Sequence, residues 1–178
     1  MLKLDHSILP PGTEFGEFTV HGGADLVGKN KIADFFYDYW LSKHDGDHLP
    51  CRADIRPTDI RQHLDHLVIM DIGRDKQPFS LNVRLIGTHV ANFYGEISGK
   101  DINEMTNQIA AARIYHTSAL VLEQSLPQLC ITPAVSPDRQ YLEAYALYLP
   151  LYDSSREIEK ILVAVDVASK RTGRSLSV

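Results

Sequence analysis

Apolar residues recur at helical spacing directly after Lys31, and this pattern predicts an amphipathic helix. Asn30 has the side chain of a good N-cap, and the polar cluster at 45–47 ends the pattern. The apolar positions follow the spacing i, i+3, i+4, i+7 and i+8: Ile32, Phe35, Phe36, Tyr39 and Trp40. A stripe this broad suggests a homodimer interface, and the alternative is burial against the chain's own sheet.

Strand patterns begin at Leu67. The residues from there to Ile72 are almost all apolar, which is typical of a strand covered on both faces. From Leu81 to Leu85 apolar and polar residues alternate, which predicts a half-buried strand paired with the first in a hairpin. Three further strands are expected, over residues 129–135, 141–151 and 158–167.

Short helices are expected at residues 58–63 and 88–94, and a longer helix at residues 107–124. Asp101 and Glu104 have the spacing of a capping box, which predicts one more short helix. In the longer helix, one face combines apolar and small residues, and we expect it to pack on the sheet: Ile109, Ala112, His116, Ala119 and Leu120.

This order of elements predicts an α+β fold, in which a five-stranded antiparallel sheet carries helices on one face. The chain has 178 residues and 44% of them are hydrophobic, as in one globular domain. We expect that domain at residues 31–167. A glycine- and proline-rich N-terminal extension at 1–30 precedes it, and a C-terminal tail at 168–178 follows it.

Charge and composition narrow the possible partners. The net charge of −5 argues against nucleic-acid binding, which needs a concentrated basic surface. The chain contains neither a signal peptide nor a run of about 20 apolar residues, so we expect no membrane partner. Cys51 and Cys130 are too few for a disulfide framework and suit a reducing compartment. A cytoplasmic location is therefore expected.

Several short motifs stand along the chain in a fixed order. An aromatic-Trp pair ends the first helix, a Pro-x-Arg-x-Asp-x-x-Pro segment follows, and an Arg-Leu-x-Gly-Thr element and a Tyr-Gly-x-x-x-Gly turn come later. In this order and spacing they resemble a bacterial group of single-domain PAS proteins. The residues that carry the resemblance are Trp40, Pro50, Arg52, Asp54, Pro57, Gly87, Gly95 and Gly99.

The resemblance implies a sensory or protein-interaction module in bacterial signalling rather than an enzyme. It also implies a cavity between sheet and helices that could hold a small ligand, and a separate signalling partner such as a kinase. No cofactor is implied, because the His or Cys placements that hold haem or flavin in PAS domains find no match here. Residues that could line such a cavity are Arg84, His89, Phe93, Tyr94, Tyr115, His116 and Tyr145.

The same residues have blander interpretations. The aromatic ones could simply fill the core, and Arg84, if roofed by helices, would need a partner such as Glu143. Likewise, Asp54 could cap a helix and Arg52 could tie its loop, or both could read an anionic ligand.

Histidines raise the question of a metal site. His44 and His48 flank two aspartates, but this turn lacks a clear third and fourth ligand, so a solvated loop is favoured. His63 and His66 are spaced i, i+3, yet the helix is expected to end between them. We therefore predict no metal site.

Two other classes of function stay open. In a small α+β enzyme, an isomerase or hydrolase, His116, Tyr145 and Arg84 would form an acid–base pocket. However, the chain contains no established catalytic motif, and Cys51 has no dedicated base beside it, so we predict no catalytic residues. A purely structural adaptor would instead have an exposed apolar patch and no cavity.

Overall fold

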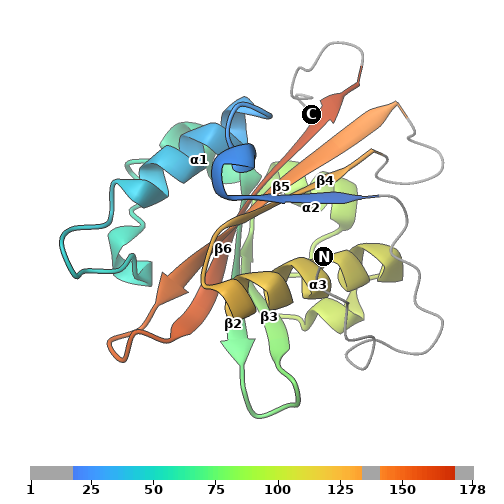
Figure 1. Ribbon diagram of the computed structural model, residues 1–178. Helices are drawn as coiled ribbons and strands as arrows, with labels where there is room; N and C mark the ends of the chain where they lie inside the picture. The colour runs from blue at the N-terminus through green and yellow to red at the C-terminus, as the bar shows by residue number, and fades with distance from the viewer. Residues whose placement is uncertain (1–17, 134–140, 171–178) are drawn as a thin grey trace.

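A six-stranded sheet organises the computed structural model, which describes residues 18–133 and 141–170 (Figure 1). Every neighbouring pair of strands is antiparallel, in the order β1-β4-β5-β6-β2-β3. The strands are β1 Thr19–Gly22, β2 Leu67–Gly73, β3 Ser80–Ile86, β4 Gln128–Thr132, β5 Leu142–Tyr152 and β6 Ile158–Ser169.

In the ranges that the structure describes, three α-helices and four 3-10 helices accompany the sheet. They are α1 Lys31–Leu41, α2 Thr88–Tyr94, α3 Gln108–Gln124, η2 Gly23–Leu26, η3 Arg52–Asp54, η4 Arg61–His66 and η5 Ile102–Glu104. As predicted, Asn30 caps α1 by accepting hydrogen bonds from two amides, and Asp101 and Glu104 form a capping box. Within the described ranges, none of the helices has the length and apolar character that crossing a bilayer demands.

The α+β class and the antiparallel sheet are confirmed, but the number of strands is six rather than five. The additional strand, β1, lies within the segment expected as an extension and pairs with β4. It has four residues, bounded by Gly22 and Gly23, and is too short to give a clear alternating pattern. The domain boundaries proposed from the sequence remain a prediction.

Helices cover both faces of the sheet rather than one (Figure 1). Helix α1 packs on β5 and β6 from one side, whereas α2, α3 and η5 lie on the other. The reason is that β5 and β6 are apolar on both faces. Leu147 and Leu162 face α1, while their neighbours Tyr148 and Val163 face the opposite cluster.

The aromatic stripe of α1 is buried within the chain. Phe36 is fully buried, and Trp40 is 6% exposed and donates its indole N–H to the carbonyl of Pro150 at 2.8 Å. The stripe therefore covers the chain's own sheet, which was the alternative left open by the sequence. It is not available as the homodimer interface that its width suggested.

The buried face of α3 is also not the expected one. Ile109 is 44% exposed, whereas the residues turned inward include Ala110, Ala111, Arg113 and Val121. Helix α3 carries three consecutive alanines, so small residues lie on several of its faces and the apolar spacing does not fix the side that meets the sheet.

The edge strand β3 is covered along its outer side by the segment that leads into η5. Val83 donates its amide to Lys100 at 2.9 Å, and Gly99 donates its amide to Val83 at 2.7 Å. An isolated bridge joins Asn82 and Asp101. These bonds hold η5 against the edge of the sheet.

Two motif glycines serve different purposes. A Cβ on Gly87 would lie 2.2 Å from the carbonyl oxygen of Asp65 and 2.6 Å from that of Leu64, so main chain fills the space. Gly95 has no neighbour within 4 Å of such a Cβ, but its φ of +90° is a conformation that other residues rarely adopt.

We expect Gly87→Ala to lower the free energy of unfolding by about 1–3 kcal/mol or more, because the methyl group collides with backbone that cannot rotate away. Gly95→Ala should cost about 1–2 kcal/mol, from the strained φ alone. Urea denaturation of both variants measures the difference. Equal stability of Gly87→Ala and wild type would contradict the close approach described here.

Candidate ligand cavity

A cavity of about 70 Å³ lies between the sheet and its cover of α2, η5 and α3. Strands β2, β4, β5 and β6 form its floor, while Val90 and Tyr94 of α2, Ile102 of η5 and Ala110 of α3 belong to its cover. Most of the lining is apolar, so any ligand is held mainly by burial of apolar surface.

The lining includes a buried cation. Arg113 of α3 is 7% exposed, and its side chain belongs to the lining. Among the residues that the structure describes, those that line the cavity include no aspartate or glutamate. Its other polar side chains belong to Tyr94, Cys130, Thr132 and Tyr148. A guanidinium among phenol, thiol and hydroxyl groups gives this space a positive, donor-rich character.

The polar side chains of the cavity are protonated at neutral pH. Burial raises the pKa of Tyr94 to about 12, against the opposing charge of Arg113, and burial also raises the pKa of Tyr148 well above its usual value. Burial likewise raises the pKa of the Cys130 thiol, although hydrogen bonds with Thr117 and Thr132 and the charge of Arg113 oppose the shift. Both phenols therefore keep a proton that they can donate.

Of the residues expected at a ligand site, Tyr94 lines this cavity. His89 is buried near the start of α2, where its ring contacts that of Phe93 edge-on, with the ring centroids 5.4 Å apart. Tyr115 points to the loop before α3, where its hydroxyl donates to Asp101 at 3.2 Å. His89, Phe93 and Tyr115 are not among the residues that line the cavity.

The remaining candidates lie far from one another. The side chain of Arg84 is 71% exposed and forms an ion pair with Asp71 at 2.7 Å, so it is not roofed by helices, and its partner is Asp71 rather than Glu143. Tyr145 belongs to the cluster on the α1 face and donates to Glu143 at 2.7 Å. His116 packs edge-on against Phe18 at 5.6 Å. The acid–base pocket of the enzyme hypothesis is therefore not assembled.

Four residues that line the cavity were not predicted from the sequence: Arg113, Cys130, Thr132 and Tyr148. Tyr148 and Cys130 occupy inward positions of strands that were predicted, so strand alternation could have indicated their face. Arg113 gave no such signal, because it lies outside the face of α3 that the apolar spacing selected.

A second buried polar group lies at the junction of several elements. Asp166 of β6 is 3% exposed and accepts a hydrogen bond from the side chain of Asn30 at 2.8 Å. The ring nitrogens of His66 and His89 each lie 3.7 Å from its other oxygen. His66 donates to the carbonyl of Val165 at 2.9 Å. This arrangement joins the start of α1, η4, α2 and β6 through side chains whose hydrogen bonds lie inside the protein.

Comparison with known proteins identifies the family. The family model described as a PAS domain matches residues 29–165, so the chain belongs to the PAS domain family. Proteins of this kind act as sensory or interaction modules. No curated protein matches the chain.

Solved structures with this fold include light-oxygen-voltage proteins. An RNA-binding light-oxygen-voltage receptor shares 7% identity with a TM-score of 0.51, over 89% of this chain and 40% of its own. The light-state structure of the light-oxygen-voltage region of the blue-light photoreceptor Aureochrome1 shares 11% identity with a TM-score of 0.40, over 65% of this chain and 91% of its own. The chain thus spans less than half of the first receptor, and the likeness concerns the fold.

The cavity is too small for a flavin, one of the cofactors held by some PAS domains. A flavin has three fused rings, and pockets for ligands of that size enclose about 300–1,000 Å³. The present space of about 70 Å³ would have to widen severalfold. The cavity also contains the thiol of Cys130, on strand β4. Burial raises the pKa of this thiol, so it keeps its proton at neutral pH.

The two thiols should differ in reactivity. Cys51 is partly exposed and Cys130 is 4% exposed with a raised pKa, so Cys130 presents little thiolate to an alkylating reagent. We expect iodoacetamide to modify Cys51 first and Cys130 only after denaturant is added. Peptide mass spectrometry over time identifies the modified residue. Rapid modification of Cys130 in the native protein would mean that the cavity is open to solvent.

Proposed function

We propose that this PAS module is a non-enzymatic sensor of a small anion that carries an apolar chain, with a short-chain carboxylate as the best candidate. The observation that carries this proposal is an apolar cavity with the buried guanidinium of Arg113 and two buried tyrosines in its lining. A carboxylate would accept hydrogen bonds from this guanidinium and from the tyrosine hydroxyls.

The size of the cavity supports a ligand of few atoms. A water-sized group occupies about 10–15 Å³ by the same measure, so about 70 Å³ accommodates on the order of five or six such groups. Butyrate, with four carbons and two oxygens, matches this number. Its alkyl chain would contact residues such as Val163 and Ala146, and its carboxylate would point to Arg113.

The proposed output is a shift between two arrangements of the helical cover. A ligand that contacts both sheet and cover stabilises one of them only by its difference in affinity between the two. The changed surface would then be read by a separate bacterial signalling protein, such as a kinase. We place the module in the cytoplasm, because two free thiols suit a reducing compartment.

The RNA binding named for one structural neighbour is not part of this proposal. That receptor is a larger protein, of which the matched part is 40%. The net charge of −5 on the present chain also disfavours contact with a phosphate backbone. Catalysis is not proposed either, since Arg84, His116 and Tyr145 occupy separate places.

The charge requirement can be tested on the wild-type protein with two ligands of the same shape. Butyrate should bind, and butyramide should bind at least about tenfold more weakly, because a charge-assisted hydrogen bond contributes about 1.5–3 kcal/mol. Titration followed by amide chemical shifts measures both affinities. Equal affinity for the two, or binding of neither, would remove the carboxylate proposal.

A pair of variants locates the site. Arg113→Met removes the buried cation and should abolish the preference for butyrate, whereas Arg84→Met removes an exposed cation and should retain it. Circular dichroism establishes that each variant is folded before binding is compared. Loss of the preference in Arg84→Met alone would place the ligand elsewhere.

A further inference from the structure

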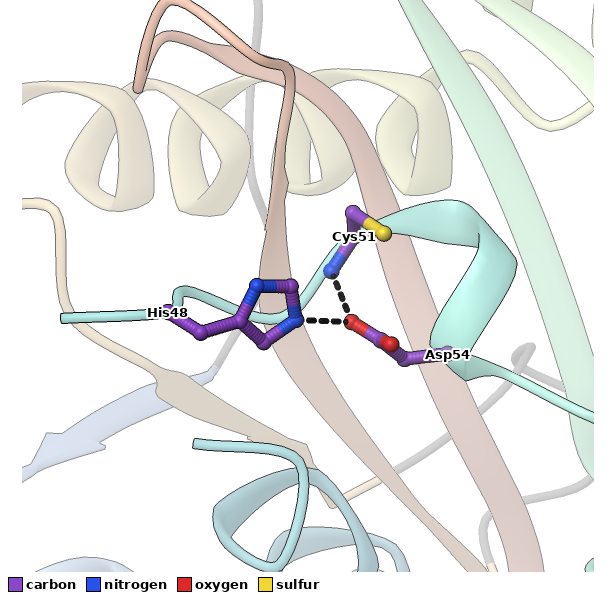
Figure 2. Close-up of side chains that lie close together, drawn as sticks. All are labelled: His48, Cys51 and Asp54. Carbon is purple, nitrogen blue, oxygen red and sulfur yellow. Dashed lines mark hydrogen bonds and ion pairs between the residues drawn. The ribbon is translucent and has the colours of Figure 1, made fainter. Parts of the chain in front are cut away.

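Three side chains of the kinds that bind metals lie close together outside the cavity, on the loop between α1 and η4. His48, Cys51 and Asp54 each bring one ligand atom within 4.8 Å of the other two (Figure 2). From this geometry we propose that the loop binds one zinc-class divalent cation through His48, Cys51 and Asp54. A water molecule would complete the coordination.

The three side chains are held in place before any metal arrives. The amide of Cys51 donates to the carboxylate of Asp54 at 2.9 Å, and the side chain of Cys51 accepts the amide of Asp54 in return. His48 is fixed by a main-chain bridge with Asp45 and donates its Nε2 proton to Asp54 at 2.7 Å (Figure 2). A site positioned by its own backbone loses little entropy on binding.

The loop itself is anchored to the sheet. The carbonyl of Pro50 accepts the amide of Tyr152 at 2.8 Å, and the carbonyl of Asp47 accepts a hydrogen bond from Arg156 at 2.8 Å. The segment that carries the ligands is therefore tied at Asp47 and Pro50 to β5 and the turn that follows it. Access is retained, because the side chains of His48 and Asp54 are 48% and 27% exposed.

The chemistry of the three ligands selects the metal. Thiolate, imidazole and carboxylate together suit zinc, whereas magnesium and calcium prefer oxygen alone. In the bound form, thiolate and carboxylate carry two negative charges, which balance a divalent cation. Three protein ligands with a fourth position for water is the arrangement of an open zinc site.

The required movement is small. Zinc bonds of about 2.0–2.3 Å in a tetrahedron place ligand atoms about 3.3–3.6 Å from one another. His48 Nε2 and the Asp54 oxygen are now 2.7 Å apart because a proton lies between them. Metal binding at Nε2 would leave the proton of neutral His48 on Nδ1, and the thiol proton of Cys51 would be released to solvent. Affinity should therefore fall as the pH falls.

A second cluster, Asp65, His66 and His89, has similar spacing but weaker chemistry. The Nε2 atom of His89 accepts the amide of Val167 at 3.1 Å, so in neutral His89 the other ring nitrogen carries the proton. A metal would have to break this buried hydrogen bond. The loop site gives up the hydrogen bond between His48 and Asp54, whose side chains are partly exposed rather than buried.

Cobalt(II) is a suitable probe, because it replaces zinc and gives a thiolate-to-metal charge-transfer absorption that magnesium cannot give. We expect one cobalt per chain, with this absorption, in protein kept reduced by a phosphine. Zinc should displace the cobalt and magnesium should not. Lowering the pH from neutral to mildly acidic should weaken binding.

Matched variants identify the ligands. Serine is itself a good N-cap, so Cys51→Ser keeps the cap of η3 while removing the thiolate, and it should abolish the absorption. His48→Gln should weaken cobalt binding about tenfold or more. His44→Gln changes a neighbouring exposed histidine and should have no effect.

Two results would overturn the proposal: no charge-transfer absorption in the wild type at millimolar cobalt, or an absorption that survives in Cys51→Ser. Retention of wild-type thermal unfolding by Cys51→Ser makes the second comparison interpretable. The proposal does not depend on the ligand of the cavity, since none of the three residues lines it.

Discussion

The fold depends on the burial of β5 and β6 from both sides. Both faces of these strands are apolar, so neither face can be left to water. Helix α1 therefore covers one face, and α2 with α3 covers the other. The same burial constrains Asp166, whose carboxylate needs partners inside the protein and finds one in Asn30. The residue that caps α1 therefore also fixes the start of that helix to the sheet.

The cavity exists because small side chains meet across the interface between the sheet and α3. Ala144 and Ala146 on β5 face the side on which Ala110 of α3 lies, so the walls do not interdigitate fully. Arg113 belongs to the same lining, one turn further along the helix. The small side chain of Ala110 and the charged side chain of Arg113 thus reach the cavity from neighbouring turns of α3. A ligand in the cavity would therefore contact this helix directly.

Much of the fold could be read from local patterns, because capping residues and strand alternation act over a few positions. The cap at Asn30, the capping box at Asp101 and the strands from Leu67 and Leu81 are examples. The cavity lining was harder to read, since it depends on the rotation of α3, and a run of alanines does not specify that rotation. The cluster of His48, Cys51 and Asp54 was missed for another reason: the histidines were weighed against nearby aspartates, whereas the turn of η3 brings a thiol and a carboxylate back toward His48.

The segment at 99–101 performs two tasks at once. Its main chain covers the outer edge of β3, and it continues directly into η5, whose Ile102, with Met105 just beyond, closes the cavity. An occupant that pushes these two side chains outward strains the bonds between this segment and Val83. Filling of the interior would then loosen the cover of β3, and an uncovered strand edge is a surface to which a partner can add a strand of its own.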